Sequence, residues 1–192
     1  MPTGHRPARK AGYTAGRVKP PGRPRTIAAV QVRLATIDDS EAIRRIYNVE
    51  VRSSTVTFDI VERTAADQAA WISDRSGAHV VTVAESAGAV VGFASLSPYR
   101  PRAAYSTSVE DSVYVHRDHH GRGVGRMLLG DLTERAAAHG FHAVFARIVG
   151  GHEASIGLHA AHGFEIVGHE REVGRKFGRW LDVMVMELLL GH

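Results

Sequence analysis

The chain has 192 residues, of which 44% are hydrophobic and 23% are charged, and it contains no cysteine. This composition is ordinary for a globular domain with its own core, and the lack of cysteine excludes disulfides, cysteine nucleophiles and thiolate metal sites. The net charge of +4 is unevenly spread, because residues 1–26 hold seven of the 24 basic residues and no acidic one, which leaves 17 basic and 20 acidic residues elsewhere. Its basic character therefore belongs to the N-terminal segment and is a poor argument for nucleic-acid binding.

The N-terminal segment, residues 1–29, is rich in Gly, Pro and Arg. It has no continuous apolar stretch of the kind found in secretory signals, and its prolines break any amphipathic helix of the kind found in transit peptides. We expect a disordered extension, with a contact arm or a targeting segment as alternatives, followed by a single domain over residues 30–190. No run of 18 apolar residues occurs, so we expect no membrane-spanning helix and a cytoplasmic protein.

The first half of the domain is predicted from hydrophobic periodicity and from helix-start residues. In chain order we expect a strand at 30–36, a helix from Asp38 or Asp39 to about Val51, a loop or extended segment at 54–59, a helix from Thr64, and strands at 79–86 and 90–99. Asp and Thr are typical helix N-caps because their side chains accept from free backbone N–H groups. The short AGA between the last two strands predicts a hairpin.

The second half alternates more regularly between strands and helices. We expect a loop at 99–107, a strand at 108–115, a glycine-rich turn, a helix at 125–140 that stops at Gly140, a strand at 143–149, a short helix at 153–163, and strands at 164–172 and 180–190. The last strand is apolar on both faces, as in a strand buried within a sheet. The order β-α-α-β-β-β-α-β-α-β-β predicts a mixed sheet in an α/β domain.

The turn HRDHHGRGVGR (116–126) stands between a strand and a helix. A helix N-terminus carries unpaired N–H groups and a partial positive charge, and glycines let a phosphate approach that backbone. Arg122 and Arg126 add charge, so the segment suits a diphosphate. A simple tight turn is the alternative, since the segment is neither a Walker loop nor G-x-G-x-x-G.

Two other uses of this histidine-rich turn are disfavoured by spacing. The residues His116, Asp118, His119 and His120 are nearly consecutive and lack the i, i+4 helical spacing of a metalloprotease, so we expect no metal. A serine hydrolase would need a nucleophile elbow, and the sequence contains no G-x-S-x-G.

The segment around Gly121–Gly125 resembles the pyrophosphate loop of the GNAT acetyltransferases, whose pattern is [QR]-x-x-G-x-[GA]; His120 departs from it at the Gln/Arg position. Further segments resemble the phosphinothricin and methionine sulfoximine acetyltransferase branch, namely STVTF (54–58), VEDSVYV (109–115), ASIGLHAAHGF (154–164) and VGRKFGRWLDVMVMEL (173–188). The resemblance covers residues 30–190. It implies the GNAT acyl-CoA N-acyltransferase fold, with a sheet that splays between the strands at 108–115 and 143–149 and is flanked by helices.

The resemblance also implies acetyl-CoA as co-substrate. Its binding is expected from the turn and from the strand before it, through Gly121, Arg122, Gly123, Val124, Gly125 and Arg126 and through the backbone of Val113, Tyr114 and Val115. A backbone N–H near Val115 is expected to bind the oxyanion. His152 stands where the family often has an Asn that contacts pantetheine, so an imidazole could replace one amide contact there.

Glu110 and His159 are the candidate catalytic residues. Glu110 lies in a strand, where an acid is disfavoured, and by alternation it shares a face with Ser112 and Tyr114. The family places a Glu here at the substrate amine, so Glu110 is the expected base, directly or through water; a salt-bridged strand Glu is the alternative. His159 stands where this branch carries His, and its role as acid, second base or polar contact stays open.

Arg100 and Arg102 are the candidate substrate-binding residues, because Arg binds carboxylates through two hydrogen bonds and the family uses this loop for the substrate. The alternative is two solvated loop arginines. In KFGRWLD (176–182), Phe177 and Trp180 could pack in the core or against a loop. In related enzymes this hairpin region contributes to a homodimer, so the resemblance implies one here.

The resemblance thus implies an acyl-CoA-dependent N-acetyltransferase. It would move an acetyl group by direct attack from acetyl-CoA to the α-amine of a small amino acid or analogue, such as phosphinothricin, methionine sulfoximine or methionine sulfone. Two alternatives remain: a protein N-terminal or polyamine acetyltransferase on the same fold, and a non-catalytic module that binds acyl-CoA or, through the basic segment, nucleic acid. The loop arginines count against a polyamine site. We expect a small-molecule partner, with neither membrane nor nucleic acid.

Overall fold

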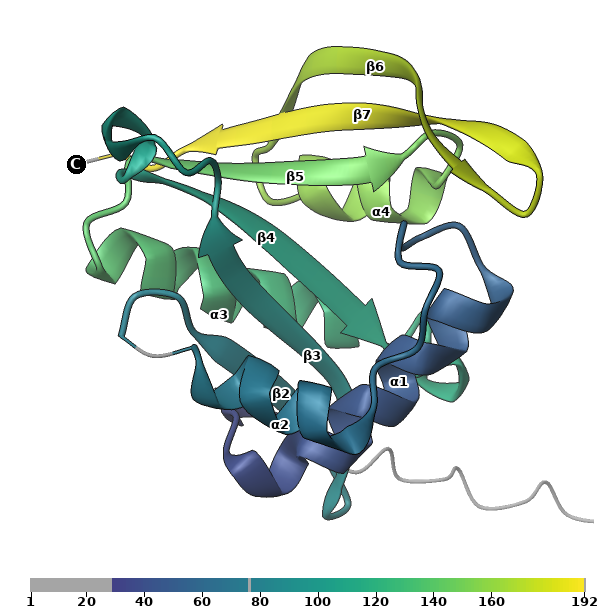
Figure 1. Cartoon of the computed structure of the whole chain (residues 1–192). Coiled ribbons are helices and arrows are strands. Elements are labelled where there is room, and N and C mark those ends of the chain that lie inside the picture. Colours follow the sequence, from purple (N-terminus) through teal and green to yellow (C-terminus); the bar gives the residue numbers. More distant parts are fainter. Residues whose placement is uncertain (1–28, 76, 192) are drawn as a thin grey trace, which may run out of the picture.

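The computed structural model describes residues 29–75 and 77–191 (Figure 1). The extension predicted over residues 1–29 lies outside these residues, apart from its last position. The elements are β1 (Val30–Leu34), α1 (Ser40–Ser53), α2 (Ala65–Ser73), β2 (Val81–Ser86), β3 (Ala89–Pro98), β4 (Ser108–Val115), α3 (Val124–Ala138), β5 (Ala143–Val149), α4 (Glu153–Ala160), β6 (Glu165–Lys176) and β7 (Arg179–Leu189). Their order confirms the predicted one. No helix within the described ranges is long and apolar enough to cross a membrane.

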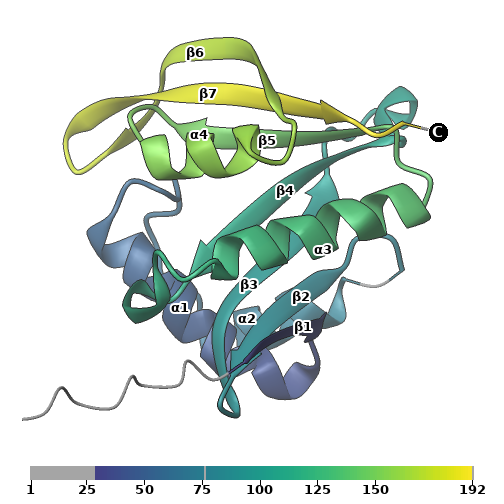
Figure 2. The ribbon, with the colours of Figure 1, turned by 180° about the vertical axis from the view of Figure 1, so that it is seen from behind.

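One mixed sheet organises the described chain, with strand order β1-β2-β3-β4-β5-β7-β6. Helices α1 and α2 cover one face, and α3 and α4 cover the other (Figures 1 and 2). An apolar core fills each interface, with Leu128 and Leu132 of α3 buried on one side and Ile43 of α1 on the other. Helix α3 lies so close to β3 that a Cβ atom on Gly92 would be 3.0 Å from the Leu128 side chain. That glycine therefore sets how deeply the glycine-rich turn at the start of α3 sits against the sheet.

The two N-terminal helices begin at the predicted residues, but through different contacts. Thr64 caps α2, since its hydroxyl accepts from the Asp67 N–H at 3.1 Å. Asp39 occupies the N-cap position of α1, yet its carboxylate accepts from the Arg33 guanidinium at 2.7 Å and from the Thr36 N–H at 2.8 Å. The Arg33 hydrogen bond is the main cause that holds the Asp39 pKa below its usual value. Asp39 thus ties the start of α1 to strand β1.

The sheet splays at the junction between β4 and β5, as predicted. These strands pair in parallel at Ser108↔Ala143, Val109↔Val144 and Glu110↔Phe145, and then diverge (Figure 1). Strand β4 continues beside β3 as far as Val115↔Gly92, and β5 continues beside β7 as far as Val149↔Val183. The diverging strands leave a wedge, here called the strand gap, between residues 111–115 and 146–149.

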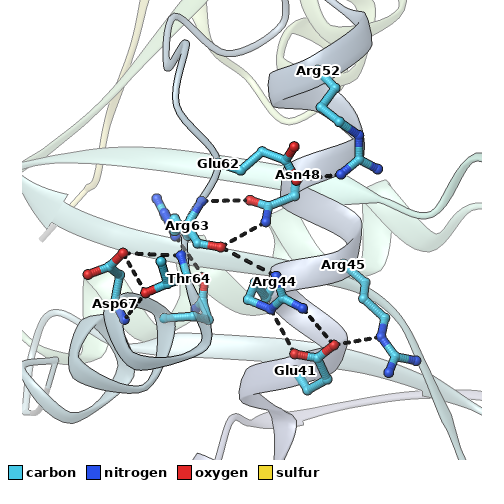
Figure 3. A network of polar contacts seen from close by, with 10 residues as sticks. Glu41, Arg44, Arg45, Asn48, Arg52, Glu62, Arg63, Thr64 and Asp67 are labelled. Atoms are coloured by element: carbon cyan, nitrogen blue, oxygen red, sulfur yellow. Dashed lines mark hydrogen bonds and ion pairs between the residues drawn. The ribbon is translucent and has the colours of Figure 1, made fainter.

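The connection between α1 and α2 borders the strand gap and is held by a polar network (Figure 3). The Asn48 side chain accepts from the Arg63 N–H at 3.0 Å and donates to the Arg63 carbonyl at 2.9 Å. In the first part of the connection, the Tyr47 hydroxyl of α1 contacts the Thr57 hydroxyl at 2.9 Å and donates to Asp59 at 2.6 Å. These bonds hold an irregular segment whose backbone belongs to no helix or strand.

Candidate active site

The backbone of β4 is available to a ligand in the strand gap. The His116 N–H donates to the Val91 carbonyl of β3 at 2.8 Å. Because N–H and C=O groups of successive strand residues point to opposite edges, those of Val115 and Val113 point into the gap. The Val115 carbonyl indeed lies 2.9 Å from Nε2 of His120, on the side away from β3. An extended ligand lying in the gap would meet N–H and C=O groups of β4 as another strand does.

The glycine-rich turn has the geometry of an anion site. The Met127 N–H makes the first intrahelical bond, to the Gly123 carbonyl at 3.1 Å, so the N–H groups of residues 124–126 have no acceptor within α3. Gly121 and Gly123 have φ of 70° and 80°, a conformation that other residues adopt only with strain. Exposed Arg122 and Arg126 flank these groups. Partial positive charge, free donors and two cations therefore meet at one helix start.

His120, the departure from the family pattern, has a structural contact. Its Nε2 lies 2.9 Å from the Val115 carbonyl, so the ring bridges the turn back to the end of β4. The neighbouring rings of His116 and His119 meet edge to face at 5.9 Å. Among the described residues, no group of three or more His, Asp or Glu side chains is placed to hold a metal ion. The His116 and His120 side chains thus contact the backbone of the turn and of the end of β4.

A cavity of about 270 Å³ opens in the strand gap. It is lined by residues of the α1–α2 connection, β4, β5, α4 and β7, namely Val56, Thr57, Phe58, Glu110, Asp111, Ser112, Val113, Tyr114, Ala146, Arg147, Ile148, Val149, His152, Ser155, His159 and Val183. It unites five of the predicted site residues: Glu110, Val113, Tyr114, His152 and His159. Arg100, Arg102, Val115 and residues 121–126 lie outside this lining.

Glu110 is half-buried at the point where β4 and β5 part. The face predicted for Glu110 is confirmed. Tyr114 lies on the same face of β4, and its ring stacks on Phe93 with 5.1 Å between the ring centroids, on the side of the sheet that α1 covers. Burial raises the Glu110 pKa above its usual value, and the cation of Arg147 opposes that rise only in part. A carboxylate with a raised pKa, beside a cavity, is suited to take up a proton near neutral pH.

His159 is buried on the opposite side of β4 from Glu110, with a relative exposure of 3%. Its Nδ1 lies 2.8 Å from the Ser155 carbonyl, and its Nε2 lies 3.1 Å from Oδ2 of Asp111. Burial by itself lowers the His159 pKa, but the hydrogen bond and charge of Asp111 outweigh it and hold the pKa above its usual value. His159 therefore lines the cavity as one half of a buried acid–base pair.

His152 occupies the N-cap position of α4 and lines the same cavity as His159. Burial lowers its pKa, and the nearby His120 ring lowers it further. A neutral imidazole can both donate and accept one hydrogen bond. Burial and the His120 ring thus both favour the neutral form of His152.

The two loop arginines are exposed. Arg100 lies with its guanidinium carbon 4.9 Å from the centre of the Tyr99 ring, and Arg102 precedes a short 3-10 turn. Arg147, which the sequence analysis missed, is the arginine that lines the cavity; it donates to Glu170 at 2.7 Å. An Arg inside the otherwise apolar strand AVFARIV was the available signal.

The α1–α2 connection forms one wall and is docked on the β6–β7 hairpin. Lys176 is buried, with 4% exposure, and donates to the Thr57 carbonyl at 2.8 Å. The Phe58 ring lies directly over Gly174, where a Cβ atom would be 2.2 Å from the ring. Residues far apart in sequence thus hold Thr57 and Phe58 against the cavity.

The site combines a splayed sheet, a helix start with the geometry of an anion site, and a half-buried carboxylate. Comparisons with known proteins show which family this chain resembles. The sequence matches the acetyltransferase (GNAT) domain over residues 32–185. It is 41% identical over 164 residues to an L-methionine sulfoximine/L-methionine sulfone acetyltransferase of Pseudomonas aeruginosa, covering 84% of this chain and 95% of that protein. It is also 41% identical to a phosphinothricin N-acetyltransferase of Streptomyces coelicolor, covering 83% and 96%.

A solved structure agrees with this match. The crystal structure of a GNAT superfamily phosphinothricin acetyltransferase from Sinorhizobium meliloti in complex with acetyl-CoA is 38% identical, with a TM-score of 0.81 over 84% of this chain and 89% of that one. The sequence, the fold and the strand gap therefore lead to one conclusion: this chain belongs to the GNAT family of acetyltransferases.

Proposed function

We propose that this enzyme transfers an acetyl group from acetyl-CoA to the α-amine of a small amino acid or analogue of the methionine sulfoximine, methionine sulfone or phosphinothricin type. The observation that carries the proposal is the placement of Glu110, half-buried with a raised pKa at the point where β4 and β5 part and the cavity begins. The names of relatives that span nearly the whole domain support the substrate class.

The described residues fit the co-substrate. The N–H groups of residues 124–126, with Arg122 and Arg126, would hold the diphosphate. The gap-facing backbone of Val113 and Val115 would pair with the pantetheine arm, and His152 would contact one of its amides. Acetyl-CoA supplies a thioester carbonyl that an amine can attack.

Glu110 acts as the base in this proposal. Only a free amine attacks a carbonyl, so the ammonium group of the amino acid must first lose a proton. Glu110 accepts that proton directly or through a water molecule, and its raised pKa brings proton affinity closer to that of the amine. A gap-facing N–H near Val115 donates to the carbonyl oxygen as negative charge develops there. In this proposal His159 is the residue that acts on the CoA sulfur as the sulfur leaves the acetyl group.

Three arginines surround the acceptor end. Arg147 lines the cavity but already binds Glu170, and both Arg100 and Arg147 act electrostatically on Glu110. Arg100 and Arg102 are exposed in the loop before β4, where the Arg100 guanidinium lies over the Tyr99 ring. We assign the carboxylate of the amino acid to Arg100 and Arg102, with Arg147 as the fixed positive charge between that carboxylate and Glu110.

The enzyme is proposed to be a cytoplasmic homodimer. Large apolar side chains lie exposed on the β6–β7 hairpin and the α1–α2 connection, with exposures of 61% for Trp180, 56% for Phe177, 74% for Ile60 and 76% for Val61. Their exposure rules out the core packing considered for Phe177 and Trp180 and leaves these large apolar side chains available to a partner. Sedimentation should give twice the 20.8 kDa chain mass; a 20.8 kDa species at assay concentration would refute the dimer.

Replacing Gly174 by Ala should raise the KM for the amino acid with little change in the KM for acetyl-CoA. The new methyl group would lie 2.2 Å from the Phe58 ring, so the ring must leave its seat and the cavity wall shifts with it. We expect a KM rise of about 5- to 30-fold, equivalent to 1–2 kcal/mol of lost binding.

Gly168→Ala is the matched control for this change. Gly168 lies in the same strand, but its added Cβ would meet Val185 at an ordinary 3.6 Å. Steady-state kinetics should show both KM values near wild type for this variant. An equal acceptor KM in the Gly174 and Gly168 variants would show that Phe58 does not shape the acceptor site.

The proposed function is tested by an acceptor panel. Purified protein with acetyl-CoA should release CoA when given L-methionine sulfoximine, L-methionine sulfone or L-phosphinothricin, and mass spectrometry should place one acetyl group on the α-nitrogen. A polyamine and a short peptide complete the panel. Faster acetylation of either of these two would replace the proposal by the corresponding alternative.

A further inference from the structure

Asp111 is a buried carboxylate that the acceptor chemistry leaves unexplained. It follows Glu110 on β4 and therefore points to the opposite face, beside the buried Val109. Its relative exposure is 6%, and its Oδ1 is buried without a hydrogen-bond partner among the described residues. A buried carboxylate is costly unless a neighbouring cation compensates it. Its neighbour in the cavity is His159.

The protons on His159 follow from its two contacts. The Ser155 carbonyl, 2.8 Å from Nδ1, can only accept a hydrogen bond, so Nδ1 carries a proton. With Asp111 ionised, its carboxylate, 3.1 Å from Nε2, also only accepts, so Nε2 then carries a proton as well. The Phe164 ring, edge-on at 5.0 Å, limits rotation of the imidazole. The ring is therefore held as an imidazolium.

Two further titratable groups act on this pair within the described structure: Glu110 acts on Asp111, and His152 acts on His159. His152, at the start of α4, acts on His159 electrostatically, and burial lowers its pKa. A neutral His152 leaves Asp111 as the charge that acts on His159 from the neighbouring strand. Both Asp111 and His159 line the cavity that also holds Glu110.

We propose that Asp111 is a positioning residue that keeps Nε2 of His159 protonated, and that His159 gives this proton to the sulfur of CoA during acetyl transfer. The inference rests on the proposed acetyl transfer. The bond from the amine nitrogen to the acetyl carbon forms, the C–S bond breaks, and its electron pair goes to sulfur with the Nε2 proton. The second proton that the nitrogen loses as it becomes an amide passes to solvent. His159 is left neutral with its proton on Nδ1, the tautomer that the Ser155 carbonyl stabilises.

Adjacent residues of one strand thus separate the removal of the first proton from the amine and the delivery of a proton to sulfur. Glu110 points to the acceptor face and takes the proton of the amine, whereas Asp111 points to the α4 face and controls the donor of the proton to sulfur. Solvent afterwards removes the proton from Glu110 and restores the one on Nε2. Glu110 and Asp111 both line the cavity in the strand gap, although their side chains lie on opposite faces of β4.

The test is an NMR titration of protein labelled with ¹⁵N-histidine, with His159 assigned by comparison with His159→Gln. In the wild type, both ring nitrogens of His159 should stay protonated at pH values above the range in which histidine usually titrates. In Asp111→Asn the loss of the Nε2 proton should move to lower pH, by about 1 to 3 pH units for a close opposite charge. Asp182→Asn, which removes the exposed partner of His169, should leave His159 unchanged.

The kinetic arm uses the same variants. The fall of kcat at high pH should move to lower pH in Asp111→Asn in parallel with the titration, and Asp111→Glu should restore part of it. If Asp111 had only a structural role, Asp111→Asn would lower kcat at every pH and would not change the pH at which kcat falls. An unmoved His159 titration would overturn the role of Asp111, and a moved titration with an unmoved limb would overturn proton donation to sulfur.

Two further readings keep the test decisive. If Asp111→Asn does not fold, the wild-type spectrum suffices, because a neutral His159 ring at pH 7.5 overturns the proposal and a doubly protonated ring supports it. The titration requires no turnover. A negative acceptor panel would therefore overturn the proposed function, whereas a failed titration would overturn the Asp111–His159 mechanism alone.

Discussion

Replacing Glu110 by Gln should lower kcat for acetyl transfer at neutral pH by about 10²- to 10⁴-fold, the usual contribution of a positioned general base. Gln preserves the size of the side chain but cannot accept the proton of the ammonium group. Binding of acetyl-CoA should be unchanged, because the contacts proposed for the co-substrate do not include the side chain of Glu110.

The pH dependence has a definite sign. Glu110 is a base only when ionised, and burial raises its pKa, while the cation of Arg147 lowers it and the charge of Asp111 raises it. Arg100 and Glu170 also act on it, with opposite signs. Wild-type kcat should therefore rise as the pH passes upward through a pKa above the usual Glu range.

In Glu110→Gln this rise should vanish, and the residual rate should grow only as the free amine accumulates at higher pH. Glu165→Gln, the same change at an exposed strand position, is the control and should behave as wild type. Stopped-flow or steady-state kinetics across pH provides the measurement. An unchanged kcat–pH profile in Glu110→Gln would remove Glu110 from the role of base.

Replacing Gly123 by Val should abolish the thermal protection that acetyl-CoA gives. Gly123 has φ of 80° and accepts the first intrahelical bond of α3, so a β-branched residue there must change the turn that presents the N–H groups of residues 124–126. At 100 times the Kd, a ligand stabilises the wild type by about 2.7 kcal/mol, or roughly 5–10 °C in Tm. We expect less than about 1 °C in the variant.

Gly88→Val separates backbone strain from loss of the anion site. Gly88 has φ of 76° in the β2–β3 turn, and a Cβ atom there meets open space, as at Gly123. This control should lose comparable stability without ligand and keep the full shift with acetyl-CoA. Scanning fluorimetry provides both readings, and a full shift in Gly123→Val would disprove the loop assignment.

Local patterns in the sequence were sufficient for the elements, and the family resemblance supplied five of the sixteen residues that line the cavity. The strand at 108–115 was predicted with its bounds and its faces, because Val alternates with polar residues and a glycine turn follows. Strand β6 was predicted to end at residue 172 but continues to Lys176. Its register shifts between Glu170 and Gly174, and Glu172 has φ of 51°, so alternation is lost where the strand bends.

Contacts between distant residues explain what the sequence left out. Asp111 meets His159 across 48 residues, and Lys176 meets the Thr57 carbonyl across 119. No local pattern encodes such pairs, because they depend on how the strands and the α1–α2 connection pack. Asp111 still carried a signal: an acid on the apolar face of a buried strand requires a partner.

The central claim is that the acceptor is an α-amino acid, and its most direct test compares one amino acid with its own amine. Wild-type kcat/KM should be measured for L-methionine sulfone and for 3-(methylsulfonyl)propan-1-amine, which lacks only the carboxylate, with correction for the fraction of free amine. We predict that removing the carboxylate lowers kcat/KM by at least about 100-fold, because the arginines lose their partner. Equal or greater efficiency with the amine would contradict the account.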